Sequence, residues 1–213
     1  MANLKKASYR TISVLMTTIY LNISPAMAND EQTKQENAAF KEAVQAVKDK
    51  NFTDAIALFE EQAKLSRHDA QYNLALLLKQ GLGIPQNYPE ALKWTWLAHL
   101  GGVKKAQGLA DMLLDLVPEK RQDKTRNQVS DILTERIDSG DLNALTQFAR
   151  FHLDVLVEPD YETAYSWYSV AAALKMPGGI RGREDVIEEV DPEKLVELQD
   201  KATEIFKNLT SPE

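Results

Sequence analysis

The chain has 213 residues, a formal net charge of −7, 44% hydrophobic residues and no cysteine. Nucleic acid and anionic lipid bind best to a positive protein surface, so neither is expected as the main partner of this acidic chain. The lack of cysteine excludes disulfides, thiolate catalysis and zinc-thiolate sites, and the apolar residues suffice for one large core.

The first 28 residues have the pattern of a secretory signal peptide. Three basic residues precede a largely apolar stretch over 11–23, and Ala26 and Ala28 have the spacing of a small-x-small cleavage site. The apolar stretch is shorter than the roughly 20 residues that a membrane-spanning helix needs, which disfavours an uncleaved anchor. We therefore expect cleavage after Ala28, a periplasmic or secreted protein, and no direct membrane insertion of the mature chain.

Residues 29–37 are polar, and we expect them to form a frayed segment ahead of the folded part. From Ala38 onward, apolar residues recur three and four positions apart, as they do on one face of a helix. This spacing predicts a first helix that ends near Val47 and, after a turn at Asn51, a second helix over 55–63.

A second and clearer pair of helices is predicted over 70–101. Leu74 and Leu78 lie on one face of its first helix, which Gly81 can end. Asn87 can then cap a second helix. The buried stripe expected on that second helix consists of Ala91, Trp94 or Leu97, and Ala98. The segment therefore predicts a helical hairpin.

The start of that second helix recurs along the chain. Asn51, Asn87 and Asp160 are each followed by an aromatic residue and, four positions on, by alanine, with spacings of 36 and 73 residues. Because 73 is close to two periods, a weaker hairpin is expected between the last two. Its helices are predicted at about 104–116 and 122–138, with a charged turn beginning at Val117, and a fourth hairpin is predicted over 141–174.

Hairpins that repeat every 34 to 40 residues are typical of an α-solenoid, in which each unit is buried only by stacking on its neighbours. The second unit resembles the Sel-one-like repeat (SLR), a relative of the tetratricopeptide repeat (TPR), in its Gly81-x-Gly83 turn and its Asn87-Tyr88-x-x-Ala91-x-x-Trp94 helix start. The fourth unit shares the Trp167-Tyr168-x-x-Ala171-Ala172 end but lacks the two glycines. The first and third units are degenerate.

The resemblance covers about 38–174 and implies an all-α fold of about four stacked helix-turn-helix units. After it, residues 175–213 are expected to form a linker with a glycine-rich turn and then a C-terminal capping helix from Pro192 to about Leu209, with Asp191 as its N-cap. One side of this helix is apolar and the other is charged, as a terminal repeat requires.

No catalytic, nucleotide-binding or metal-binding motif is recognisable in the chain. His68, His99 and His152 are isolated in sequence, so they are expected to pack in the fold, and the acidic cluster over 184–191 is expected to be a solvated helix face. No metal or cofactor is expected. Trp94 and Trp167 match the core aromatic of the repeat, whereas Trp96 either packs on the neighbouring hairpin or lies exposed as a contact surface.

The resemblance implies a non-enzymatic protein-protein interaction scaffold, here a monomer in the periplasm that binds a protein or peptide in its concave groove. The first helices of the hairpins are expected to line the groove, which would suit an acidic or C-terminal peptide segment. The candidate groove residues are Tyr72, Leu76, Lys79, Thr146 and Arg150. Two alternatives stay open: a cell-envelope enzyme or enzyme subunit related to peptidoglycan or β-lactams, and a periplasmic regulator of a membrane sensor. Relatives claimed as enzymes typically pair cysteines in each repeat, and this chain has none.

Overall fold

The computed structural model describes residues 25–211, with side chains from residue 37 onward. Most of the predicted signal peptide, residues 1–24, lies outside the described part. Within 25–211 the regular secondary structure is entirely helical, which confirms the predicted all-α class. The helices are α1 (Pro25–Lys48), α2 (Phe52–Lys64), α3 (His68–Gln80), α4 (Tyr88–Leu100), α5 (Lys105–Leu114), α6 (Glu119–Asp138), α7 (Asn143–Asp154), α8 (Tyr161–Ala173), α9 (Gly179–Ile187), the 3-10 turn η1 (Pro192–Lys194) and α10 (Leu195–Thr210).

The chain divides into two units, residues 1–35 and 36–213, and α1 crosses the boundary between them. The polar segment 29–37, expected to be frayed, is part of this helix. The folded array belongs entirely to the second unit, and the arrangement described below is that of the second unit alone.

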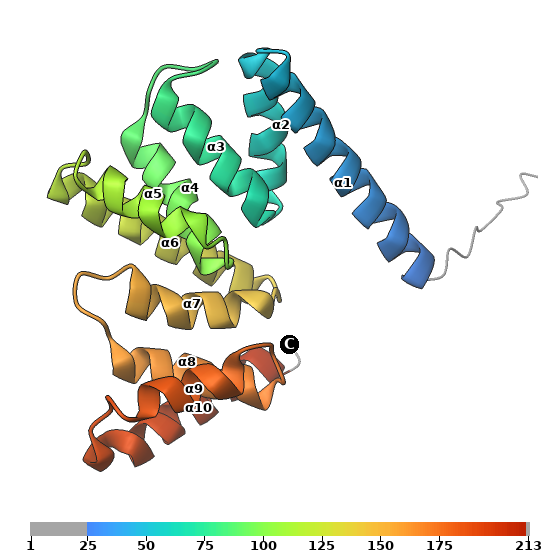
Figure 1. The fold of residues 1–213 in the computed structure, drawn as a ribbon. Helices are drawn as coiled ribbons and strands as arrows, with labels where there is room; N and C mark the ends of the chain where they lie inside the picture. The colour runs from blue at the N-terminus through green and yellow to red at the C-terminus, as the bar shows by residue number, and fades with distance from the viewer. Residues whose placement is uncertain (1–24, 212–213) are drawn as a thin grey trace, which may run out of the picture. The chain divides into compact units, whose positions relative to one another are not determined.

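Two tight helical hairpins form the framework of the second unit, α3 with α4 and α7 with α8 (Figure 1). The predicted stop and start signals are present in the first of them. Gly81 ends α3 in the left-handed conformation, with φ of 68°, and the Asn87 side chain accepts a hydrogen bond from the Glu90 amide at 3.2 Å. The pairs α2 and α3, α4 and α5, and α6 and α7 pack on one another between the hairpins, as the predicted solenoid requires.

The third pair, α5 and α6, is open. Helix α5 packs on α4, whereas α6 packs on α4 and α7. Helix α6 begins at Glu119, so the predicted charged turn is mostly helical, and the Gln122 amide closes the connection by donating to the carbonyls of Leu114 and Val117 at 3.0 and 2.8 Å. The buried residues of α6 form one narrow stripe, which can cover only one surface: Thr125, Val129, Leu133 and Ile137.

The C-terminal segment also forms two helices on a single partner. Residues 175–185 were predicted to include a glycine-rich turn, but α9 begins at Gly179 and packs on α8. A Cβ atom at Gly182 would overlap the Tyr168 ring, so glycine permits this close approach. Asp191 caps η1 by accepting from the Glu193 amide at 2.9 Å, and α10 packs on α8 as a capping helix should.

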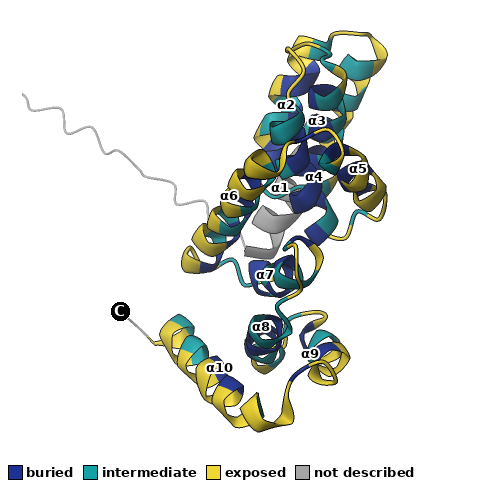
Figure 2. Ribbon diagram, turned by 90° about the vertical axis from the view of Figure 1, so that its left-hand side faces the viewer, coloured by how far each residue is buried: buried dark blue, intermediate teal, exposed yellow. Residues whose placement is uncertain are grey.

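Helices α4 and α8 are buried on nearly all sides, while α6 and α10 are exposed over most of their surface (Figure 2). Trp96 is 3% exposed, so it packs inside the array and does not form a contact surface. Trp94 is also buried. Trp167 is half-buried and meets the Phe148 ring edge-on at a centroid distance of 5.0 Å.

Candidate binding clefts beside helix α7

Two clefts lie beside α7 and share Arg150. The first, which we call the α7 cleft, has a volume of about 290 Å³ and is lined by the end of α4, by α7 and by the turn before α9. Its polar lining residues are Asn143, Thr146, Gln147, Arg150 and Tyr168. The second, the α5 cleft, has a volume of about 340 Å³ and includes Trp96, His99, Asp111 and Asp154. Together they give α7 a cleft on the side of α4 and the turn before α9 and another on the side of α5.

Arg150 joins α7 to the end of α4. Its guanidinium donates to the carbonyls of His99 and Leu100 at 3.2 and 3.0 Å, and to the Asp154 carboxylate at 2.9 Å. The last carbonyls of a helix have no partner within the helix, and a cation there is favoured by the helix dipole. Arg150 therefore caps α4 from the next tight hairpin, and most of its hydrogen-bonding capacity is used inside the array.

His99 and Asp154 form a second link between α4 and α7, with 3.1 Å between Nε2 and Oδ2. Burial alone would raise the pKa of the Asp154 carboxyl, but the hydrogen bond with His99 and the charge of Arg150 outweigh it. The net result is a pKa below the ordinary value. Asp154 is therefore an anion that balances the Arg150 cation between the two clefts.

The predicted groove residues fall into two groups. Thr146 and Arg150 line the α7 cleft, while Tyr72, Leu76 and Lys79 lie on α3 and line neither cleft. Tyr72 and Leu76 are partly buried against the main hydrophobic cluster. The structure thus brings together the two candidates on α7 and places the three on α3 elsewhere.

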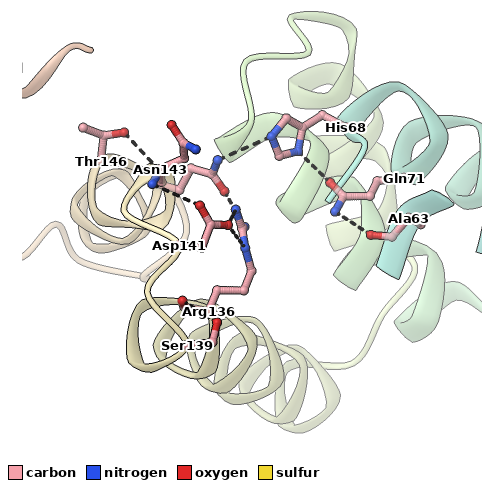
Figure 3. Close-up of polar contacts among 9 residues, drawn as sticks. Ala63, His68, Gln71, Arg136, Ser139, Asp141, Asn143 and Thr146 are labelled. Atoms are coloured by element: carbon pink, nitrogen blue, oxygen red, sulfur yellow. Dashed lines mark hydrogen bonds and ion pairs between the residues drawn. The ribbon is translucent and has the colours of Figure 1, made fainter. Parts of the chain in front are cut away.

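A polar network positions the start of α7 (Figure 3). Arg136 at the end of α6 donates to the Asp141 carboxylate at 2.7 and 3.0 Å and to the Gln147 side chain at 2.8 Å. Asp141 also accepts from the Asn143 amide at 3.1 Å, and Gln147 lies 3.4 Å from Nε2 of His68. The network therefore fixes three consecutive units around the residues that line the α7 cleft.

The charges in this network follow from burial and pairing. Burial would raise the pKa of the Asp141 carboxyl, but hydrogen bonding to Arg136 and its charge lower it overall. Burial lowers the pKa of His68, and the hydrogen bond with Gln71 opposes it only in part. His68 lies against Gly101, where a Cβ atom would overlap the imidazole. The network is thus built around a neutral histidine that requires glycine in the facing turn.

The sequence correctly placed the three histidines in the fold but missed their partners. His152 lies edge-on between Phe148 and Phe151, with Nδ1 3.6 Å from the Asp160 carboxylate. Burial lowers its pKa more than Asp160 raises it. His99 and Asp154 are 55 residues apart in the chain, and no local motif joins positions at such a distance. Only the stacking of the hairpins brings them together.

The chemistry available at the α7 cleft is hydrogen bonding by neutral groups. Burial raises the pKa of Tyr168 to about 12, so its hydroxyl remains protonated and can donate. Among the described residues, no group of His, Asp and Glu is arranged to hold a metal ion. None of the helices in this part of the chain combines the length and apolarity needed to cross a bilayer.

Comparison with known proteins identifies the repeat. The Sel1 repeat family model matches residues 68–95 and 151–176, within the two tight hairpins. These two segments are Sel1 repeats. These are the second and fourth predicted units, the two with the clearest SLR residues in sequence. Sel1-repeat proteins are generally protein-interaction scaffolds and typically are not enzymes. No curated protein matches the chain.

Solved Sel1-repeat structures are also similar to the chain. A protective antigen of uropathogenic Escherichia coli strains, which displays an SLR fold, is 18% identical over 73% of this chain, with a TM-score of 0.31. This chain spans 40% of that antigen. A Sel1 repeat protein from Oxalobacter formigenes is 18% identical over 85% of this chain and 76% of its own length, with a TM-score of 0.37.

Proposed function

We propose that this Sel1-repeat chain is an exported, monomeric interaction scaffold that binds a peptide segment of a partner protein in the α7 cleft. The observation that carries the proposal is the gathering of Asn143, Thr146 and Tyr168 in one cleft, where α7 and α8 meet the end of α4. Amide and hydroxyl groups match the donors and acceptors of a peptide main chain. Because Arg150 is already paired with Asp154, neutral hydrogen bonding rather than charge is expected to dominate.

Site-specific photocrosslinking tests the binding face. A photoreactive phenylalanine analogue placed at Thr146 should crosslink a partner in intact cells, whereas the same group at the exposed α6 residue Thr134 should not. The double change Asn143→Ala and Thr146→Ala should abolish capture of that partner while the helical circular dichroism and melting temperature stay unchanged. The matched control combines Gln128→Ala and Thr134→Ala, both exposed on α6. Capture that survives the α7 changes, or fails with the α6 changes, would refute the assignment.

Export is supported by the tripartite leader within residues 1–28. N-terminal sequencing of protein from the periplasmic fraction should begin at or near Asn29, and light scattering of that protein should give the monomer mass. Soluble cytoplasmic protein that still begins with Met1 would contradict the leader assignment.

A further inference from the structure

A separate cleft lies near the C-terminal end of the array, between α8, α9 and α10. It has a volume of about 330 Å³, and α7 contributes none of its lining. Helix α9 and helix α10 both pack on α8, and the cleft lies over the α8 surface that these helices flank. We call it the cap cleft.

The origin of the cap cleft is seen by comparing the α4–α6 block with the α8–α10 block. A shift of 73 residues relates Asn87 to Asp160 and Trp94 to Trp167, and it continues through the following helices. Four positions on the last two helices of each block are buried in both: Leu113 and Val186, Val117 and Val190, Thr125 and Leu198, Val129 and Ala202. Leu100 and Leu133 are also buried, but their counterparts Ala173 and Phe206 are not. The helices of the two blocks therefore correspond in register, and each residue of the cap cleft has a counterpart in the first block.

The counterparts fill the corresponding space with side chains. Trp96 is buried in the first block, and the guanidinium of Arg126 on α6 lies 5.5 Å from its ring centroid. In the second block the position of Trp96 is occupied by Ser169. Two other lining residues of the cap cleft are alanines where the first block has larger side chains: Ala173 corresponds to Leu100, and Ala202 corresponds to Val129. Three other lining residues are larger than their counterparts: Tyr165 for Leu92, Arg183 for Ala110 and Phe206 for Leu133. The position of the Trp96 ring is nevertheless left without a side chain, and a cleft of about 330 Å³ lies there.

Three polar groups of the cap cleft lack partners among the described residues, although Thr203 Oγ1 donates to the Gln199 carbonyl at 2.9 Å. Arg183 replaces Ala110, is the only charged lining residue, and forms no ion pair within residues 37–211, whereas Arg181 on the same helix faces Asp185. Ser169 Oγ is buried without a hydrogen-bond partner. Tyr165 is 4% exposed, and its hydroxyl has no partner among the described residues. Of these groups, Ser169 Oγ is the buried one, and buried polar atoms are normally paired. Together with the Arg183 cation at the same cleft, it indicates a ligand with an acceptor and a negative charge.

We propose that the cap cleft binds the C-terminal residue of a polypeptide, with its aromatic side chain in the space that Trp96 fills in the first block and its carboxylate on Arg183. A chain terminus suits the cleft because it carries a side chain and a carboxylate on one Cα atom, and guanidinium pairs well with carboxylate. The preceding residues leave through the open side. This site goes beyond the proposed function, since it uses other residues than the α7 cleft.

Peptide binding to the purified chain tests the proposal. The probe is a labelled peptide that ends in Gly-Ser-Gly-Trp, with either a free carboxylate or a C-terminal amide, and binding is followed by fluorescence anisotropy. The free-carboxylate peptide should bind at least tenfold more tightly than the amide. Arg183→Gln should remove this difference, because the charged hydrogen bonds are lost. The matched control Arg181→Gln should leave it unchanged.

A second experiment fills the cap cleft with a larger side chain. Ser169→Trp introduces the tryptophan that the first block has at Trp96. It should abolish binding of both peptides without lowering the melting temperature. If that variant fails to fold, Ala173→Leu is the alternative, because it introduces the leucine that the first block has at Leu100. It should lower the affinity for both peptides at least tenfold. Neither variant should change crosslinking from Thr146, so failure here is distinguishable from failure of the proposed function.

Several outcomes would overturn the proposal. Absence of binding, equal affinity for the free and amidated peptides, or unchanged binding in Arg183→Gln would each reject the carboxylate site. If N-acetyltryptophan binds as tightly as the free peptide, the cleft serves a small amphipathic carboxylate, and the assignment to a polypeptide terminus is wrong.

Discussion

The tight hairpins α3/α4 and α7/α8 differ from the open pairs α5/α6 and α9/α10 in where their apolar residues lie. Within the tight hairpins, α4 and α8 are buried on nearly all sides. In the open pairs, α6 has one buried stripe and α10 buries only Leu198 and Ala202. A helix that is apolar all round needs neighbours on every side, whereas a helix with one apolar stripe packs on one side only, as α6 does against α4 and α7. Open pairs therefore cover the second helix of the preceding tight hairpin.

The same difference explains where clefts arise. An open pair leaves room beside the helix that it covers unless a large side chain occupies it, as Trp96 does in the α4–α6 block with Arg126 of α6 against its ring. In the α8–α10 block Ser169 leaves that room unfilled. The replacement of Trp96 by Ser169 thus opens a cleft within a segment that still matches the Sel1 repeat.

The two tryptophans test this comparison with the largest expected effect. Trp96→Ala should lower the free energy of unfolding by about 3–5 kcal/mol, because a fully buried ring is removed. Trp167→Ala should cost less, since that ring is half-buried. Urea denaturation of both variants measures the order. A larger loss for Trp167→Ala would show that the fourth unit, and not the second, holds the array together.

Glycine replacement compares the two first helices of the open pairs. Gly182→Ala in α9 places a Cβ atom on the Tyr168 ring and should destabilise by about 1–3 kcal/mol, as overpacking does. Gly108→Ala in α5 meets no atom within 4 Å and should stabilise by about 0.5–1 kcal/mol, because alanine favours the helix. Melting temperatures of the two variants should shift in opposite directions. A shift in the same direction would mean that α9 is not held closely on α8.

Arg136 connects α6 of an open pair to α7 of a tight hairpin, and its replacement tests how much this connection stabilises the array. Arg136→Met should lower the free energy of unfolding by about 1–3 kcal/mol, because Asp141 and Gln147 lose a partly buried charged partner. The control is Lys194→Ala, which removes the exposed ion pair with Glu162 and should leave the melting temperature unchanged. Equal effects of the two changes would show that the network in Figure 3 contributes no more than a surface pair.

The smallest expected effect is a pH dependence. Burial lowers the pKa of both His68 and His152 below the ordinary 6.5, so the unfolded chain binds protons at a higher pH than the folded chain. Stability is then complete above about pH 6.5 and falls as the pH drops below it. The lowered pKa values of Asp141 and Asp154 act only below the ordinary carboxyl value of 3.8.

His152→Phe isolates this contribution in the second tight hairpin. The variant should lose less stability than the parent chain between pH 7.5 and pH 5, because only His68 remains to be protonated in a buried position. Urea denaturation at both pH values provides the measurement. An unchanged difference between the two pH values would exclude His152 as a source of the acid sensitivity.

Residue patterns in the sequence located the tight hairpins well. Gly81 and Asn87 act through the adjacent backbone, so the end of α3 and the start of α4 could be predicted from local chemistry. The first turn of α6, predicted as part of a charged turn, and helix α9, predicted as a glycine-rich turn, were not predicted to be helical, because charged residues and glycines favour loops when considered alone. Their helical state depends on contacts of Gln122 with α5 and of Gly182 with α8.

Only part of the candidate site could be predicted from the sequence, because its contacts also join helices that are far apart in the chain. Thr146 and Arg150 could be placed on an accessible helix face from the repeat register, but the sequence did not show that Arg150 is occupied by Asp154 and by the end of α4. The cap cleft had a sequence signal, the 73-residue shift that replaces Trp96 with Ser169. That signal could be interpreted only once the burial of Trp96 was known.

By itself, the sequence determined the helical class, the repeat period and the turns of the tight hairpins, because spacing and capping act over a few residues. The tertiary structure alone decided which helices pair, which side chains meet across units, and which clefts remain open. Contacts such as that between His99 and Asp154 join residues far apart in the chain, and they form only when the stacking of whole helices brings their side chains together.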